Sequence, residues 1–397
     1  MKLNTILWQR VGKVIAVLSL LIVANYLWSG NSLVSSWEAK RNYLLHDSES
    51  QQHFEENSTG NKEDIYAYWD FHTNQSKTFT SYQEYVENES HLFFDEGGLA
   101  LTPGIKNTKG TQRFWTESAQ LLIFVSFMVG FLLFFVDLKT NFNTFLFSLG
   151  IKRRTIFLRK ILFTGVPLFL AILLGKLLTL VIMVQGIPQP YMNGDISSLL
   201  LSAFTSTCVM FSVYSAGVFL GTILGNLVTA PILIWLFYLA TSFIQYGFSN
   251  FLGIIGGEAL ATRFESFYQN ITNEYLDITP TTLGNLLLII GGCALVLWLG
   301  SWLYAHTSLE NNGKTVVVPQ IRLPFYLVSA LYVGLLNGLQ SFSYYGEGQH
   351  SDSLSQLFLK TVVALLISFA LLGILFYYQD LTRLWSERKA GRLSRLS

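Results

Sequence analysis

Eight apolar runs divide the chain, and most of them are long enough to cross the hydrocarbon core of a bilayer as a helix. Only 13% of the residues are charged and 51% are hydrophobic, which excludes a soluble globular protein of 397 residues. The sequence therefore predicts an all-α polytopic membrane protein with about eight transmembrane helices. These are expected at residues 14–28, 119–136, 161–184, 199–224, 230–245, 283–304, 323–340 and 356–378.

The first run, at residues 14–28, also has the length of a secretory signal peptide. Asn25, Tyr26 and Trp28 lie at its end, where a cleavage site would need small residues. We therefore expect residues 1–29 to be a short N-terminus and a retained first span.

Residues 30–118 differ from the rest of the chain, with 14 Asp or Glu against 7 Lys or Arg and no Cys. This segment is predicted to be a small α+β extracellular domain between the first two spans. Residues 32–56 can continue the first helix outward, and residues 65–72 alternate as a strand does. A cysteine-free external segment favours a bacterial cell membrane.

Basic residues concentrate in three other segments. The first 13 residues hold three, residues 137–161 hold six, and the tail from Arg383 holds five. The positive-inside rule places all three in the cytoplasm, with both termini. We call residues 138–155 the basic loop, and residues 30–118 the acidic insert.

The basic loop carries an apolar pattern followed by a cluster of positive charge. Apolar residues recur at helical spacing from Leu138 to Leu149, and three basic residues follow Gly150. This pattern predicts an amphipathic helix along the membrane surface, which Gly150 interrupts before Thr155 caps the next helix. The candidate functional residues are Phe142, Phe145, Leu146, Leu149, Lys152, Arg153 and Arg154.

The run FLFSLGIKRRTIFLRKIL, which begins within this loop at Phe145, resembles the cytoplasmic loop of type-2 (ABC-2) ABC transporter permeases. Gly150 stands where that pattern usually has Pro. A weaker similarity lies in HTSLENNGKTVVVPQIR, after the sixth expected span. The order of spans to about residue 305 is similar to the six-helix core of the family, with an external amphipathic element at residues 250–282. Residues 119–305 would then be the transmembrane core, and residues 306–397 an added helix pair with a basic tail.

The resemblance implies a coupling helix at residues 138–155, on which a separate ABC ATPase subunit acts. It also implies a homodimer or a pairing with a related permease subunit. This chain would bind no cofactor, with ATP held by the partner. A basic membrane anchor is the alternative role for the loop, because positive-inside anchoring accounts for any basic cytoplasmic segment.

Two further features lie within the expected spans. Gly217, Gly221 and Gly225 follow one another at four-residue spacing, which predicts close helix packing within the chain or, alternatively, a contact between subunits. Lys176 lies too deep in the third span for easy contact with the headgroups, so it should face protein or a water-filled path. Lys176 is the candidate residue of a translocation path. A tilt of the span that brings it to the interface is the alternative.

Motifs of catalysis are absent from the sequence, which has no HExxH, GxSxG or CxxC. Residues 308–315 resemble a phosphate-binding loop but follow an apolar span instead of a strand. We therefore expect no enzyme and no nucleic-acid partner, which disfavours an intramembrane acyl- or glycosyltransferase. The predicted function is the permease subunit of an ATP-driven exporter, and the alternative is a membrane sensor or scaffold whose extracellular domain binds a ligand. The sequence does not indicate the substrate.

Overall fold

The structure is a computed structural model that describes most of the chain. The described residues are 3–58, 66–70, 75–94, 98–100, 119–241, 247–249, 252–253, 257, 259–265, 283–311, 313–339 and 354–393. Among them, seven helices are long and apolar enough to cross a membrane. The expectation of an all-α polytopic membrane protein agrees with this finding.

The fifth expected span, at residues 230–245, corresponds to a shorter helix. This helix, α9 (Thr229–Thr241), has 13 residues and is about 20 Å long, less than the thickness of a bilayer core. Residues 242–246 lie outside the described part. The expected external element at residues 250–282 is described only at 252–253, 257 and 259–265.

The chain divides into two compact units, each built from three segments of the chain. Unit 1 consists of Met1–Met128, Arg159–Ser215 and Ile271–Ala294. Unit 2 consists of Val129–Leu158, Ala216–Asn270 and Leu295–Ser397. Four helices have residues in both units: α5 (Ala119–Lys139), α7 (Arg153–Gly186), α8 (Ile196–Ile223) and α12 (Leu283–Ala305).

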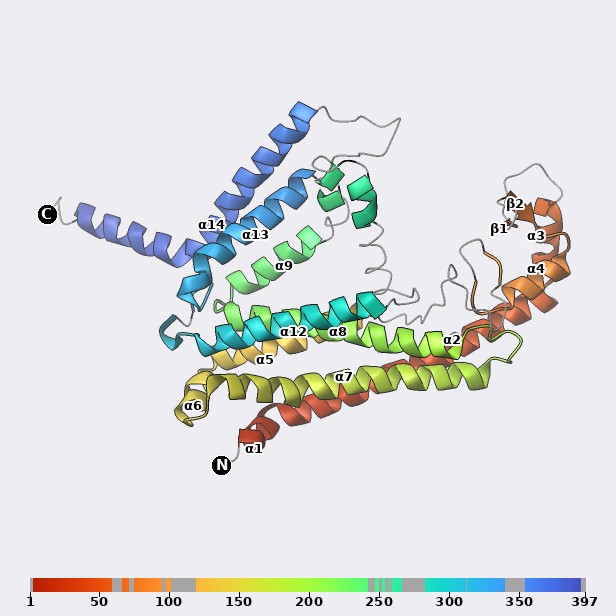
Figure 1. The fold of residues 1–397 in the computed structure, drawn as a ribbon, viewed down its shortest axis with the longest axis horizontal. Coiled ribbons are helices and arrows are strands. Elements are labelled where there is room, and N and C mark those ends of the chain that lie inside the picture. The colour runs from red at the N-terminus through yellow and green to blue at the C-terminus, as the bar shows by residue number, and fades with distance from the viewer. Residues whose placement is uncertain are drawn as a thin grey trace. The chain divides into compact units, whose positions relative to one another are not determined.

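In unit 1, a long helix α2 (Lys13–His46) lies along α7 (Figure 1). It follows α1 (Leu3–Leu7) and a π-helical turn, Trp8–Gly12. Glycines of α7 allow the two helices to approach closely, because a Cβ at Gly175 would lie 2.3 Å from the Tyr26 ring and one at Gly186 would lie 2.7 Å from Val34. With 34 residues, α2 is about 50 Å long and extends well beyond a bilayer core.

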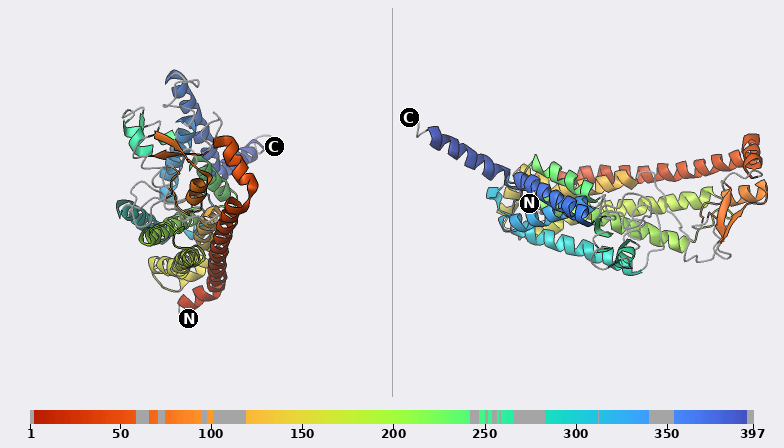
Figure 2. Two further views of the ribbon diagram at one scale, coloured as in Figure 1. Left: turned by 90° about the vertical axis from the view of Figure 1, so that its right-hand side faces the viewer. Right: turned by 90° about the horizontal axis from the view of Figure 1, so that it is seen from above.

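The described part of the acidic insert lies at the far end of α2 (Figure 2). It contains α3 (Ser48–Ser58), an antiparallel hairpin of β1 (Ala67–Asp70) and β2 (Gln75–Thr78), and α4 (Tyr82–Glu89). Ser81 caps α4 by accepting a hydrogen bond from the Glu84 amide. A small aromatic core of Phe54, Tyr66 and Tyr85 holds these pieces together.

In unit 2, α13 (Pro319–Leu339) and α14 (Leu354–Leu393) form a closely packed pair. A Cβ at Gly338 would lie 2.6 Å from the Cα of Thr361, so the two backbones nearly touch. α9 packs against the pair, with Phe237 in contact with the rings of Phe325 and Tyr332. The remaining elements of this unit are α6 (Phe142–Ser148) and a 3-10 turn, Leu309–Asn311.

Candidate functional site

The basic loop is not the single amphipathic helix that its apolar spacing predicts. α5 continues to Lys139, Asn141 takes a left-handed conformation at φ 54°, and α6 follows as a separate helix of seven residues. Gly150 ends that segment at φ 68°, a conformation that glycine adopts without strain. α7 then begins at Arg153, so Thr155 lies inside its first turn and the prediction of Thr155 as a cap is wrong.

The inner side of α6 is fixed to the end of α12. Leu146 is fully buried, and the buried Asn143 accepts a hydrogen bond through Oδ1 from the Tyr304 hydroxyl at 2.9 Å. The Tyr304 ring also contacts the rings of Phe147 and Phe157. Since an aromatic ring and a buried polar pair both hold this side, α6 has one preferred position against α12.

Arg153 makes the second attachment between the loop and α12. Its guanidinium donates to the carbonyls of Ala305 at 3.1 Å and Thr307 at 2.8 Å, where the helix ends. Carbonyls at a helix C-terminus lack partners inside the helix, and a positive charge there is favoured by the helix dipole. The same guanidinium lies 4.2 Å from the centre of the Phe147 ring. Arg153 therefore supports the loop from within and is not an exposed charge.

Three of the candidate side chains of the loop are exposed. Phe145 is 46% exposed, and Lys152 and Arg154 are exposed as well. We call these three residues the outer patch. Phe142 and Leu149 are half-buried. The seven candidate residues, which the sequence pattern had grouped together, thus separate into two that support the loop, Leu146 and Arg153, three that are exposed and two that are half-buried.

The three glycines at four-residue spacing are all buried, but they do not form one helical stripe. α8 ends at Ile223, so Gly225 lies beyond it, and its amide donates to the Thr315 carbonyl at 3.1 Å. A Cβ at Gly221 would lie only 2.4 Å from the Phe131 carbonyl oxygen of α5. The close approach at Gly221 is therefore a packing contact within this chain. Beyond α8, Leu224 forms an isolated β-bridge with Val316.

Lys176 lies inside the protein, since only 4% of its surface is exposed. Its ammonium donates to the Ser206 hydroxyl of α8 at 2.6 Å and lies 5.9 Å from the centre of the Tyr26 ring. This position agrees with the expectation that Lys176 faces protein, and it disfavours a tilt that carries the ammonium to the membrane interface. A role in a translocation path stays a prediction.

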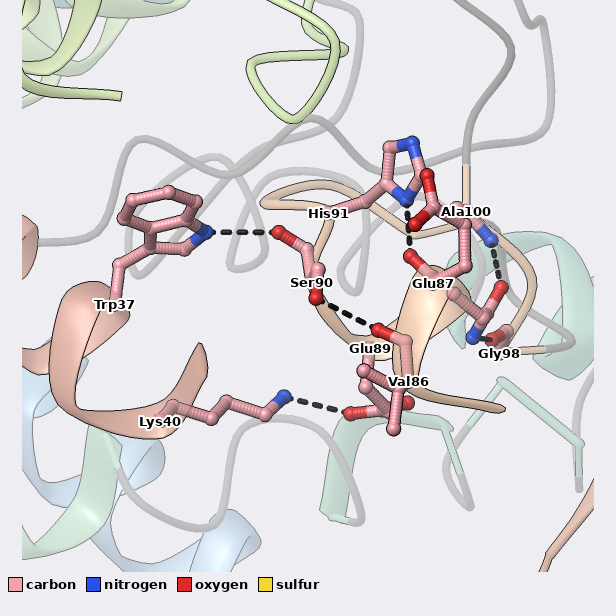
Figure 3. A network of polar contacts seen from close by, with 10 residues as sticks. Trp37, Lys40, Val86, Glu87, Glu89, Ser90, His91, Gly98 and Ala100 are labelled. Carbon is pink, nitrogen blue, oxygen red and sulfur yellow. Dashed lines mark hydrogen bonds and ion pairs between the residues drawn. The ribbon is translucent and has the colours of Figure 1, made fainter. Parts of the chain in front are cut away.

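The described part of the acidic insert that follows α2, from residue 48 on, is attached to the helices at two places. Figure 3 shows the first, where α2 meets the end of α4. There Trp37 Nε1 donates to the Ser90 carbonyl at 2.8 Å, and Lys40 forms an ion pair of 2.6 Å with Glu89. Because the indole is buried, the hydrogen bond to Ser90 holds the insert more strongly than the exposed ion pair does.

The second attachment lies at the connection between α7 and α8. The buried Asn193 side chain accepts a hydrogen bond from the Phe93 amide at 2.9 Å and donates one to the Phe93 carbonyl at 2.7 Å. The Phe93 ring packs with Leu180, Met183 and Leu199. The Asn193 side chain makes the same pair of hydrogen bonds with Phe93 that a neighbouring strand would make. It therefore holds residues 92–94 to the α7–α8 connection without a sheet.

Sequence reasoning missed Asn143, Tyr304, Phe93 and Asn193, which fix these contacts. Tyr304 resembles an ordinary aromatic at the end of a span, and an asparagine in a loop suggests a turn. The partners of both asparagines are 100 or more residues away. Local spacing carries no signal for such pairs.

Comparison of the chain with protein-family models, with curated protein sequences and with solved structures gave no match. Within the described residues, no group of three or more His, Cys, Asp or Glu side chains could hold a metal ion.

Proposed function

We propose that the chain is the membrane permease subunit of an ATP-driven ABC exporter, with the basic loop and both termini in the cytoplasm of a bacterial cell. A separate ABC ATPase subunit would bind the outer patch, and a second permease subunit, identical or related, would complete the transporter. One observation carries this proposal. Phe145 is exposed, while Asn143 and Arg153 of the same loop are hydrogen-bonded to α12.

A surface that receives force from a partner needs an anchor on the partner's side and a stiff support on the other. An exposed aromatic on the same loop as two exposed cations would supply the anchor, because aromatic side chains contribute strongly to protein interfaces. Asn143 and Arg153 supply the support, since both bind α12. A loop that only anchored the protein to lipid would need the charges but not this support.

A membrane sensor is the second candidate, and the attachment of the acidic insert favours it. The insert is bonded both to α2 and to the α7–α8 connection, so a ligand that moved the insert would also act on these helices. The two candidates differ in one respect that can be tested, because only the exporter requires an ATPase at the outer patch.

The test places the photo-crosslinking amino acid p-benzoylphenylalanine at position 145 and, in a second variant, in place of Leu158, an exposed apolar residue of α7. We expect position 145 to crosslink a nucleotide-hydrolysing subunit in native membranes, and position 158 to crosslink none. Phe145→Asp should then abolish stimulation of that subunit's ATPase activity, while Thr144→Asp adds the same charge at the neighbouring exposed position and should retain it. Crosslinking to lipid alone at position 145 would refute the proposal.

A further inference from the structure

The C-terminal helix is much longer than a bilayer requires. α14 has 40 residues and extends over about 60 Å, about twice the thickness of a hydrocarbon core. Its apolar span ends at Arg383, and the helix continues for ten more residues. We call residues 379–393 the C-terminal arm. Most of this arm therefore lies beyond the apolar span.

α14 bends partway along its length (Figure 1), and side chains from the preceding segments account for the bend. The Thr315 hydroxyl donates to the Leu375 carbonyl at 2.8 Å, and Arg322 donates to the Phe376 carbonyl. These donors compete with the helix amides for two successive carbonyls, which is a known cause of helix bending. Arg322 also forms an ion pair of 2.7 Å with Asp380. The arm therefore starts at a fixed bend and changes direction relative to the span.

One apolar face continues from the span into the arm. Tyr378, Leu381 and Trp385 are exposed at spacings of three and four residues, and Trp385 is 75% exposed. On the span, Leu371 and Ile374 lie on the same face and are also exposed. In a membrane protein, an exposed apolar face on a span meets lipid, so its continuation past the bend favours lipid as the occupant there too.

The arm is also basic. Residues 379–393 hold four Lys or Arg against two acids, Asp380 and Glu387, and Asp380 is paired with Arg322. A helix with an exposed Trp and Leu among basic residues has the composition of segments that lie in the interface of a bilayer. Clustered cations directly beyond a span are attracted to anionic headgroups.

We propose that the C-terminal arm lies along the bilayer surface, with Leu381 and Trp385 at the boundary of the acyl chains and its basic residues bound to anionic phospholipid headgroups. The bend at Leu375 and Phe376 directs the arm away from the axis of the span. This proposal does not depend on the transport function, because it needs only the span and the surface that adjoins it.

The test uses the full chain with Cys208→Ala and Cys293→Ser, in which Trp385→Cys carries the environment-sensitive fluorophore NBD. It compares nanodiscs of phosphatidylcholine with nanodiscs that also contain phosphatidylglycerol, and acrylamide serves as a neutral quencher. We expect a blue-shifted emission and a several-fold smaller quenching constant in the anionic nanodiscs. Because salt screens this attraction, the difference should shrink at about 1 M salt, where the Debye length falls to about 3 Å.

Neutralising Arg388, Lys389 and Arg392 to Gln should remove the effect of anionic lipid. Replacing three cations of the acidic insert, Lys62, Lys106 and Lys109, makes the same change in net charge and should leave the effect intact. A label that stays equally exposed to acrylamide in both nanodiscs would overturn the proposal. Equal protection in both would overturn the role of anionic headgroups, and protection that requires an added protein would show that a protein is the occupant instead.

Discussion

The attachment of the acidic insert at Asn193 can be tested with one substitution, Asn193→Ala. This change removes two buried hydrogen bonds and leaves the amide and the carbonyl of Phe93 without their partner. An orphaned buried group costs about 1–3 kcal/mol, and entry of water reduces the cost, so the local free energy of opening should fall by about 2–4 kcal/mol. The Phe93 ring keeps its contacts with Leu180 and Met183, and the insert should therefore loosen without detaching.

Hydrogen–deuterium exchange measures this loosening directly. A loss of about 2–4 kcal/mol predicts roughly 30- to 700-fold faster exchange at residues 92–94, with a much smaller change in global melting temperature. Asn31→Ala is the matched control, because Asn31 is exposed and bonds only within its own helix, to Leu27. If residues 92–94 exchanged equally in the two variants, the paired bonds of Asn193 would not hold the insert.

Three further substitutions test separate contacts. Gly221→Leu forces side-chain atoms into the Phe131 carbonyl and should cost about 1–3 kcal/mol of stability in detergent, whereas Gly291→Leu, with open space at its Cβ, should cost little. Lys176→Met removes a buried charge and should leave the melting temperature unchanged or higher, while export, once assayed, should fall. Hydrogen bonds from Ser197 and Ser198 lower the pKa of Asp195, the residue that precedes α8, to about 2. Its ionised form therefore stabilises the fold above about pH 4, and this contribution should disappear between about pH 4 and 2 in thermal melts of the wild type but not of Asp195→Asn.

The helices could be predicted from sequence because a bilayer imposes one simple rule, a long apolar run in which the backbone satisfies its own hydrogen bonds. The apolar runs alone did not define the helix ends. The first apolar run covers residues 14–28, whereas α2 continues to His46, in agreement with the predicted outward continuation from residue 32, although the helix ends ten residues before the predicted limit of residue 56. Contacts such as that of Trp37 with Ser90 support the helix outside the lipid. Apolar composition indicates only the part of a helix that contacts lipid. A helix can continue beyond that part where contacts with protein replace contacts with lipid.

In the basic loop, the sequence predicts one amphipathic helix, but the chain forms the end of α5, the separate helix α6 and the start of α7. Periodicity from Leu138 to Leu149 is real, but Asn141 has a positive φ and divides it. Asparagine tolerates this conformation better than other residues with a side chain, yet most asparagines do not adopt it. Whether Asn141 adopts a positive φ therefore depends on tertiary contacts, here the hydrogen bond between Asn143 and Tyr304.

The same contacts determine how the loop responds to a load. Moving both α6 and the start of α7 away from the end of α12 breaks the two hydrogen bonds of Arg153 and the one between Tyr304 and Asn143. Bonds to a charged group contribute about 1.5–3 kcal/mol each and a neutral one about 1, and partial exposure of Arg153 lowers the total to about 3–5 kcal/mol. A bound partner can separate the two elements only if its affinity differs between the joined and separated states by at least that amount. Below that limit, a partner that binds Phe145, Lys152 and Arg154 moves α6 and the end of α12 together.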